Sequence, residues 1–223
     1  MKKKSLTVLD LIEKAKTFCD SESNFENKDL FGITDGKAVG TFIEHKFQNY
    51  LFSQYDYNIG SSANGIDLPD DNILTDIKVT SIKQPQSSCP FKSAEQKIFG
   101  LGYNLLVFVY DKKDNNIEKY SILNFVNCSF IEKERTGDYT ITKRIIEMVK
   151  DGANKEDIVS FLIDRNLPAD DISLNNIALK ILDDTPKLGY LTISNALQWR
   201  LQYQRVVDLI DDVDGIVKIV NKK

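Results

Sequence analysis

Two aspartates and a lysine lie close together where polar turn residues alternate with β-branched ones. Residues 64–69 read Asn-Gly-Ile-Asp-Leu-Pro, and residues 73–80 read Ile-Leu-Thr-Asp-Ile-Lys-Val-Thr. This pattern is typical of two short strands joined by a tight turn. Two acids on adjoining strands, with a lysine beside them, can hold a divalent metal ion next to a phosphodiester. The candidate chemical centre is therefore Asp67, Asp76 and Lys78.

The expected hairpin would bring these side chains together. Side chains two residues apart in a strand point to the same face, so Asp76 and Lys78 face together. A turn centred on Asp71 and Asn72 places Asp67 directly across from Asp76, with Cβ atoms roughly 5 Å apart. Two carboxylates at that distance repel each other, and a bound divalent cation removes the conflict. Ligands that are all oxygen atoms favour Mg2+ over zinc.

An acid two residues before a lysine is not distinctive by itself. The same spacing occurs elsewhere in this chain, as in Asp111 with Lys113. What distinguishes Asp76 and Lys78 is their context, because they lie in a β-branched segment that follows a turn and a second acid. The alternative is a hairpin edge whose charged side chains are simply solvated.

The elements around this hairpin indicate an α/β core. Apolar residues recur at helical spacing before the hairpin, and a continuous apolar run after it is typical of a central strand covered on both faces. A segment with two prolines and several serines, residues 83–90, is expected to be a loop. The predicted helices are residues 6–18, 36–54 and 93–99, and the predicted strands after the hairpin are residues 103–110 and 117–125.

The second part of the chain is predicted to be mainly helical. Asn154 and Ser173 are placed to cap helices at their N-termini. The predicted helices are residues 141–150, 155–164, 174–182 and 194–210. The expected fold is a mixed central sheet flanked by helices, with a helical C-terminal subdomain. We place the boundary after residue 133, with a catalytic core in 1–133 and a DNA-recognition and dimerisation subdomain in 134–223.

Gly65-Ile66-Asp67 followed by Asp76-Ile77-Lys78 resembles the PD-(D/E)XK nuclease motif. The layout from about residue 36 to residue 110 is similar to that of type II restriction endonucleases. That family often adds an acid from a preceding helix, and Glu44 falls in the matching place. The family's first acid usually follows a proline, whereas here Pro69 follows Asp67. The Pro69-Asp70 pair lies in the turn, so Asp70 stays open as an alternative to Asp67.

The resemblance implies Mg2+-dependent hydrolysis of DNA phosphodiesters that leaves 5'-phosphate and 3'-hydroxyl ends. Asp67 and Asp76 would bind the metal ion, with the backbone carbonyl of Ile77 as a further ligand. Lys78 would hold the attacking water. Glu44 would tune the metal site or bind a second ion, and its alternative is a surface acid on an amphipathic helix.

Several polar and basic residues are candidates for DNA contacts. On the expected helix at residues 194–210, four side chains recur at spacings of three and four and would form one stripe without acids. Asn and Gln can pair with adenine and Arg with guanine or phosphate, which suggests a target containing A·T pairs. The alternative is a solvated polar face. The stripe is Asn195, Gln198, Gln202 and Arg205, and the other candidates are Arg200, Lys83, Ser61 and Asn64.

Composition excludes several other classes of protein. The net charge is −4, so the molecule as a whole has no nucleic-acid signature, although residues 77–94 contain three lysines and no acid. The three cysteines match no zinc spacing, and a reducing cytoplasm is expected. His45 is the only histidine, which excludes nucleases that depend on a histidine base or nucleophile. No phosphate-binding glycine loop is present, so no nucleotide cofactor is expected, and neither is a membrane segment.

These features predict a sequence-specific double-stranded DNA endonuclease of the type II restriction class. A palindromic target asks for two symmetric active sites, so a homodimer is expected. A repair nuclease or junction resolvase with the same core remains an alternative. So does a DNA-binding protein without catalysis, in which the hairpin is only structural.

Overall fold

The structure is a computed structural model that describes residues 3–60, 65–90, 92–194 and 199–222. The chain divides into two compact units, each discontinuous in sequence. The first contains Met1–Ser87, Tyr103–Ile131 and Val207–Lys223, and the second contains Ser88–Gly102 and Glu132–Val206. The functional division of the chain after residue 133 stays a prediction.

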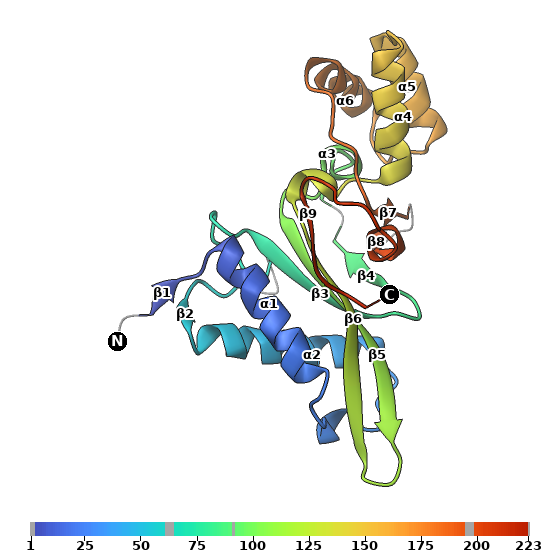
Figure 1. Cartoon of the computed structure of the whole chain (residues 1–223). Coiled ribbons are helices and arrows are strands. Elements are labelled where there is room, and N and C mark those ends of the chain that lie inside the picture. The colour runs from blue at the N-terminus through green and yellow to red at the C-terminus, as the bar shows by residue number, and fades with distance from the viewer. Residues whose placement is uncertain (1–2, 61–64, 91, 195–198, 223) are drawn as a thin grey trace. The chain divides into compact units, whose positions relative to one another are not determined.

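A mixed sheet of four strands forms the centre of the first unit (Figure 1). The strand β3 runs parallel to β5, whereas β5 and β6 pair antiparallel, as do β6 and β9. Residues 105–110 of β5 are continuously apolar and buried on both faces, which is why the sequence predicted this part of the strand. The predicted α/β class with a mixed central sheet is confirmed. In spatial order the strands are β3 (Thr75–Ser81), β5 (Asn104–Asn115), β6 (Tyr120–Ile131) and β9 (Ile216–Asn221).

Two helices pack on this sheet, and both were predicted. Helix α1 (Val8–Glu22) contacts β6 and β9, and helix α2 (Gly36–Phe52) contacts β3. Aromatic rings from both helices meet rings from the sheet, and the centroid of Phe47 lies 5.0 Å from those of Phe18 and Phe108. The smaller elements of this unit are β1 (Lys4–Ser5), β2 (Tyr55–Asp56) and a 3-10 helix (Lys28–Leu30).

A buried ion pair fastens α2 to α1. Lys46 Nζ lies 2.7 Å from Glu22 Oε2, and the Glu22 side chain is only 3% exposed. Asn27 Nδ2 also donates to Glu22 Oε1 at 2.8 Å. A buried carboxylate without partners would be costly, so these contacts hold the two helices together. The side of α2 that faces β3 carries Gly40, and a Cβ added there would lie 3.2 Å from the carbonyl oxygen of Val79. Helix and strand therefore approach closely at this point.

Three helices share an apolar core in the second unit: α4 (Tyr139–Lys150), α5 (Lys155–Asp164) and α6 (Asp171–Asp183). Asn154 caps α5 as predicted, because its side chain accepts from the Asp157 N–H at 3.0 Å. The predicted cap of α6 is wrong: Asp170 caps it and accepts from the Ser173 N–H at 2.7 Å. The smaller helices of the chain are α3 (Gln96–Phe99), α7 (Gln204–Val207) and a 3-10 helix (Lys133–Arg135).

The predicted helix over residues 194–210 is wrong. Residues Trp199–Gln202 form strand β8, which pairs antiparallel with β7 (Thr192–Ile193). Trp199 and Leu201 are buried while Arg200 and Gln202 are exposed, so burial alternates with the period of a strand. Within the described residues of this segment, only Gln204–Val207 is helical. The apolar residues recur at every second position, and that alternation outweighs the helical spacing of the polar ones.

The predicted loop at residues 83–90 contains a strand. Strand β4 (Gln86–Cys89) joins β8 and β7 in a sheet with the order β4-β8-β7. The two prolines, Pro85 and Pro90, lie immediately outside β4, where they remove no hydrogen bond from the sheet. Across the described residues, no helix is long and apolar enough to cross a membrane.

Candidate active site at the edge of the first sheet

The predicted register of the hairpin is confirmed. Leu68 and Thr75 exchange two backbone hydrogen bonds, each 2.9 Å long, in an antiparallel bridge. This pairing places Asp67 directly opposite Asp76. Where the structure describes it, the segment before the turn contains no assigned strand and pairs with β3 through this isolated bridge, so it is not the regular strand that the sequence suggested.

The carboxylate of Asp67 reaches β3. Its Oδ2 accepts a hydrogen bond from the backbone N–H of Ile77 at 2.7 Å. Strand β3 is at the edge of its sheet, and alternate residues direct their N–H and carbonyl groups to opposite sides. Thr75 directs both groups outward to Leu68, so Ile77 directs its N–H and its carbonyl to the same outer edge. The Ile77 carbonyl therefore lies on the side of β3 that Asp67 occupies.

Asp76 and Lys78 form an ion pair on one face of β3. Lys78 Nζ lies 2.6 Å from Asp76 Oδ2, as expected for side chains two residues apart in a strand. Asp76 is only 3% exposed. Burial raises the pKa of Asp76 to about 8; the Lys78 charge opposes this rise, and Asp67 adds to it. The ionised form of a carboxyl group with this pKa is destabilised by its surroundings, and a cation beside it would stabilise that form.

Glu44 comes to the same place from α2. Burial raises the pKa of Glu44 to about 7, with repulsion from Asp67 as the next cause and attraction from Lys78 acting against it. Glu44 is thus close enough to both groups to interact with them electrically. It lies one helical turn after Gly40, where α2 approaches β3 closely. Sequence reasoning missed Gly40, whose only signal is a glycine inside a helical pattern.

All four predicted catalytic residues are therefore gathered in the first unit. They come from α2, from the segment before the turn and from β3. The described residues contain no group of three or more His, Cys, Asp or Glu side chains placed to hold a metal ion by themselves. Mg2+ is commonly bound through one or two carboxylates while it keeps several waters. Asp67 and Asp76, with the Ile77 carbonyl on the same edge, fit that smaller requirement.

Asp70 has a different setting. Its two carboxylate oxygens accept from the backbone N–H of Asn58 at 3.0 Å and from Asn58 Nδ2 at 2.6 Å. Asp70 is therefore committed to holding the turn against the chain that precedes it. The geometry favours Asp67 over Asp70 as the acid that partners Asp76.

Asp70→Asn and Asp67→Asn form a matched test of that choice. We expect Asp70→Asn to keep DNA cleavage within about threefold of the parent rate, because it changes only a turn contact near the surface. Asp67→Asn should lower cleavage at least a hundredfold, because it removes a charge that would hold the cation. Initial rates on plasmid DNA measure both. A larger loss in Asp70→Asn than in Asp67→Asn would reverse the assignment.

The predicted DNA-contacting residues do not form the expected helical stripe. Arg200 and Gln202 lie on the exposed side of β8, and exposed Lys83 follows β3 in the first unit. The Arg205 guanidinium lies 3.6 Å from the ring centroid of Tyr139. The remaining candidates, Asn195, Gln198, Ser61 and Asn64, lie outside the described residues. The A·T preference inferred from the stripe loses its basis.

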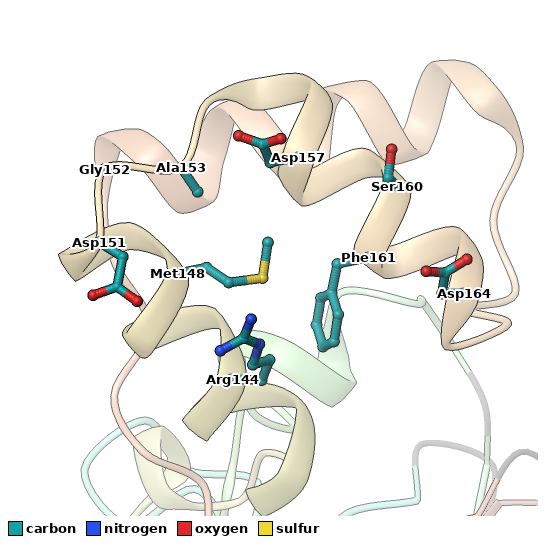
Figure 2. A pocket seen from close by; sticks show the side chains of 9 residues that line it. All are labelled: Arg144, Met148, Asp151, Gly152, Ala153, Asp157, Ser160, Phe161 and Asp164. Atoms are coloured by element: carbon teal, nitrogen blue, oxygen red, sulfur yellow. The ribbon is translucent and has the colours of Figure 1, made fainter.

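An open hollow of about 530 Å³ lies on the second unit, lined by α4, α5 and the turn between them (Figure 2). The thioether of Met148 and the ring of Phe161 point into it. Three aspartates line it against a single arginine, Arg144, and this balance suits a phosphate poorly. The aspartates are Asp151, Asp157 and Asp164. This hollow is therefore not a candidate for contact with the DNA backbone.

Comparisons with known proteins identify relatives over almost the whole chain. The family model described as type II restriction enzyme NspV matches residues 5–218. The type II restriction enzyme NspV of Nostoc sp. (strain ATCC 29411 / PCC 7524) is 51% identical over 214 residues, covering 96% of this chain and 96% of that protein. No solved structure matches.

Proposed function

We propose that this chain, which belongs to the NspV family of type II restriction enzymes, cleaves DNA with a Mg2+ ion bound by Asp67 and Asp76. As a member of that family, it is a sequence-specific endonuclease of double-stranded DNA. Type II restriction enzymes generally use divalent metal ions. The observation that supports this site is the meeting of Glu44, Asp67, Asp76 and Lys78 from three separate segments. Among the described residues, the two carboxyl groups whose pKa is raised, Glu44 and Asp76, both belong to this cluster.

Each residue of the cluster has a distinct proposed role. Asp67, Asp76 and the Ile77 carbonyl would hold the metal ion. When bound, the ion supplies Lewis acidity and lowers the pKa of water, which favours attack on the phosphodiester. Lys78 orients the attacking water and stabilises the charge that develops on the phosphate. Glu44 adjusts the charge of the site from the side of α2. The products are 5'-phosphate and 3'-hydroxyl ends.

We place this activity in the cytoplasm, on a homodimer. A palindromic site presents the same bases on both strands, so two copies related by a twofold axis can cut both strands in the same way. The dimer is tested by the mass of the purified protein with and without duplex DNA.

A digestion of plasmid and phage DNA tests the proposed function. The expected result is a set of discrete fragments with Mg2+ and no cleavage with EDTA. Sequencing of the fragment ends gives the recognition site, the stagger and the terminal groups. Cleavage confined to branched DNA would instead indicate a junction resolvase. If the protein binds DNA without cleaving it, and Asp76→Ala leaves that binding unchanged, the protein is a DNA-binding protein. That result would contradict the proposed catalytic cluster.

A further inference from the structure

Thr80 lies on the same strand face as the catalytic candidates Asp76 and Lys78, because the three residues alternate along β3. Its side chain is buried, with only 6% of the residue exposed. The Thr80 hydroxyl accepts from the backbone N–H of Gln86 at 3.1 Å. The same hydroxyl is placed to donate to the carbonyl of Gln84 at 3.2 Å or of Gln86 at 3.1 Å. The buried Thr80 hydroxyl therefore holds the segment that follows β3, through Gln84 and Gln86.

The segment fastened in this way is a short loop between β3 and β4 that is exposed at Lys83 and Gln84. Ser81 adds two bonds at its start: its carbonyl accepts from the Gln84 N–H at 3.2 Å, and its hydroxyl accepts from the Lys83 N–H at 3.3 Å. Lys83 and Gln84 are exposed, whereas the Thr80 hydroxyl that anchors them is buried. The loop thus presents a cation and an amide to solvent in a conformation set by bonds beneath it.

The position of this loop relates it to the cleaved bond. From Lys78 to Ser81, β3 advances about 10 Å, which is the axial length of about three base pairs. Residues 77–94 contain no acid, so the surroundings of Lys83 in sequence do not repel phosphate. DNA laid along the strand edge would bring its backbone to the loop within a few nucleotides of the scissile phosphate.

We propose that Thr80 is a positioning residue that holds the loop at residues 82–85, so that Lys83 contacts the DNA backbone beside the scissile phosphate. The inference rests on the proposed catalytic site. Thr80 touches neither DNA nor metal, and its effect passes through the loop. Loss of its hydroxyl leaves the Gln86 N–H without its partner and loosens the end of the loop that Thr80 holds, while the β-branched shape that β3 requires can be retained.

The test uses Thr80→Val, Thr80→Ser and Lys83→Ala in the full-length protein, on a duplex that carries the mapped cleavage site. Thr142→Val is the matched control, because the buried Thr142 hydroxyl also accepts a backbone N–H (Gly189, 2.9 Å) and donates to a carbonyl (Asp138, 2.7 Å). Both kcat and KM are measured, together with duplex affinity by fluorescence anisotropy over a series of salt concentrations.

We expect Thr80→Val and Lys83→Ala each to raise KM roughly fivefold while kcat stays within about twofold of the parent value. Each should also reduce the slope of log affinity against log salt concentration by up to about one, because one phosphate contact is lost. Thr80→Ser and Thr142→Val should resemble the parent protein. Thr80→Val combined with Lys83→Ala should be no worse than Lys83→Ala alone, because both changes remove one contact.

An unchanged KM in Thr80→Val, a fall in kcat alone, or multiplied effects in the double variant would overturn the proposal. Thr80→Ala replaces Thr80→Val if the valine variant does not fold. If the parent protein cuts no DNA with any divalent cation, the proposed function fails. The binding series still decides whether Thr80 acts through Lys83.

Discussion

Asp76→Asn is expected to lower the rate of DNA cleavage by more than about 1,000-fold while duplex binding is retained. Asp76 is the most deeply buried acid of the cluster, and its Oδ2 is 2.6 Å from Lys78 Nζ. Asparagine keeps the shape but loses the charge that would hold the cation. It also removes the ion pair between Asp76 and Lys78, so the ammonium is less firmly held.

Asp111→Asn is the matched control for this change. Asp111 also lies in a strand two residues before a lysine, and its Oδ2 is 3.7 Å from Lys113 Nζ. It is partly exposed and has no second acid opposite it, since β6 offers Asn124 at that position. Single-turnover cleavage and anisotropy on the same duplex measure chemistry and binding separately. Equal losses in both variants would mean that the Asp-x-Lys spacing, and not the cluster, supports the activity.

The apparent affinity for the metal ion is expected to rise about 50-fold between pH 6 and pH 8. The pKa of Asp76 is raised to about 8 from an ordinary value of 3.8, so the metal-free site should take up a proton there as pH falls below about 8, at the expense of the ion pair with Lys78. A metal ion must displace that proton, and the competition weakens as pH increases. Glu44, with a pKa of about 7, steepens the dependence if it also approaches the ion.

The raised pKa of Asp76 also makes the folding stability depend on pH, in the opposite direction to the metal affinity. A carboxyl group whose pKa is higher in the folded state than in the unfolded state stabilises the fold most at low pH, and this contribution is lost as pH rises from about 4 toward 8. The contribution of Asp76 to the stability of the metal-free protein should therefore decrease as pH increases. Added Mg2+ should raise the melting temperature more at pH 8 than at pH 6.

Calorimetric titration with Mg2+ at several pH values, together with melting curves, checks both effects. Asp76→Asn provides the control, because the steepest part of the pH dependence should disappear with its carboxyl group. A metal affinity independent of pH over this range would show that Asp76 is already ionised in the metal-free protein, contrary to the effect of its burial.

The local geometry of the hairpin could be predicted from sequence because it depends on short-range rules. The two-residue period of a strand puts Asp76 and Lys78 on one face, and the turn fixes which residue opposes Asp76. The choice between Asp67 and Asp70 could not be made in this way. It depends on Asn58, which binds Asp70 but lies before the hairpin and belongs to no local sequence pattern that would reveal this contact.

The C-terminal segment shows where sequence reasoning failed. Trp199 to Tyr203 alternates apolar and polar residues, yet the neighbouring Asn, Gln and Arg residues also fit a helical spacing. A short segment can satisfy both periods, and pairing with a distant strand decides between them. For β8 the distant partner is β4, which lies far earlier in the sequence, and its other neighbour, β7, has only two residues, too few to predict alone. The close approach of Gly40 to Val79 is likewise a tertiary contact without a local signal.

Strand β9 has a consequence for the order in which the enzyme matures. It comes after every other described strand, yet it pairs with β6 in the sheet that carries Asp76 and Lys78. At ordinary rates of synthesis, residues 216–221 leave the ribosome roughly 10 to 30 s after β3. Until then, one edge of β6 has no partner and α1 lacks part of the surface on which it packs. A nascent chain can therefore contain every catalytic residue before the sheet that supports them is complete.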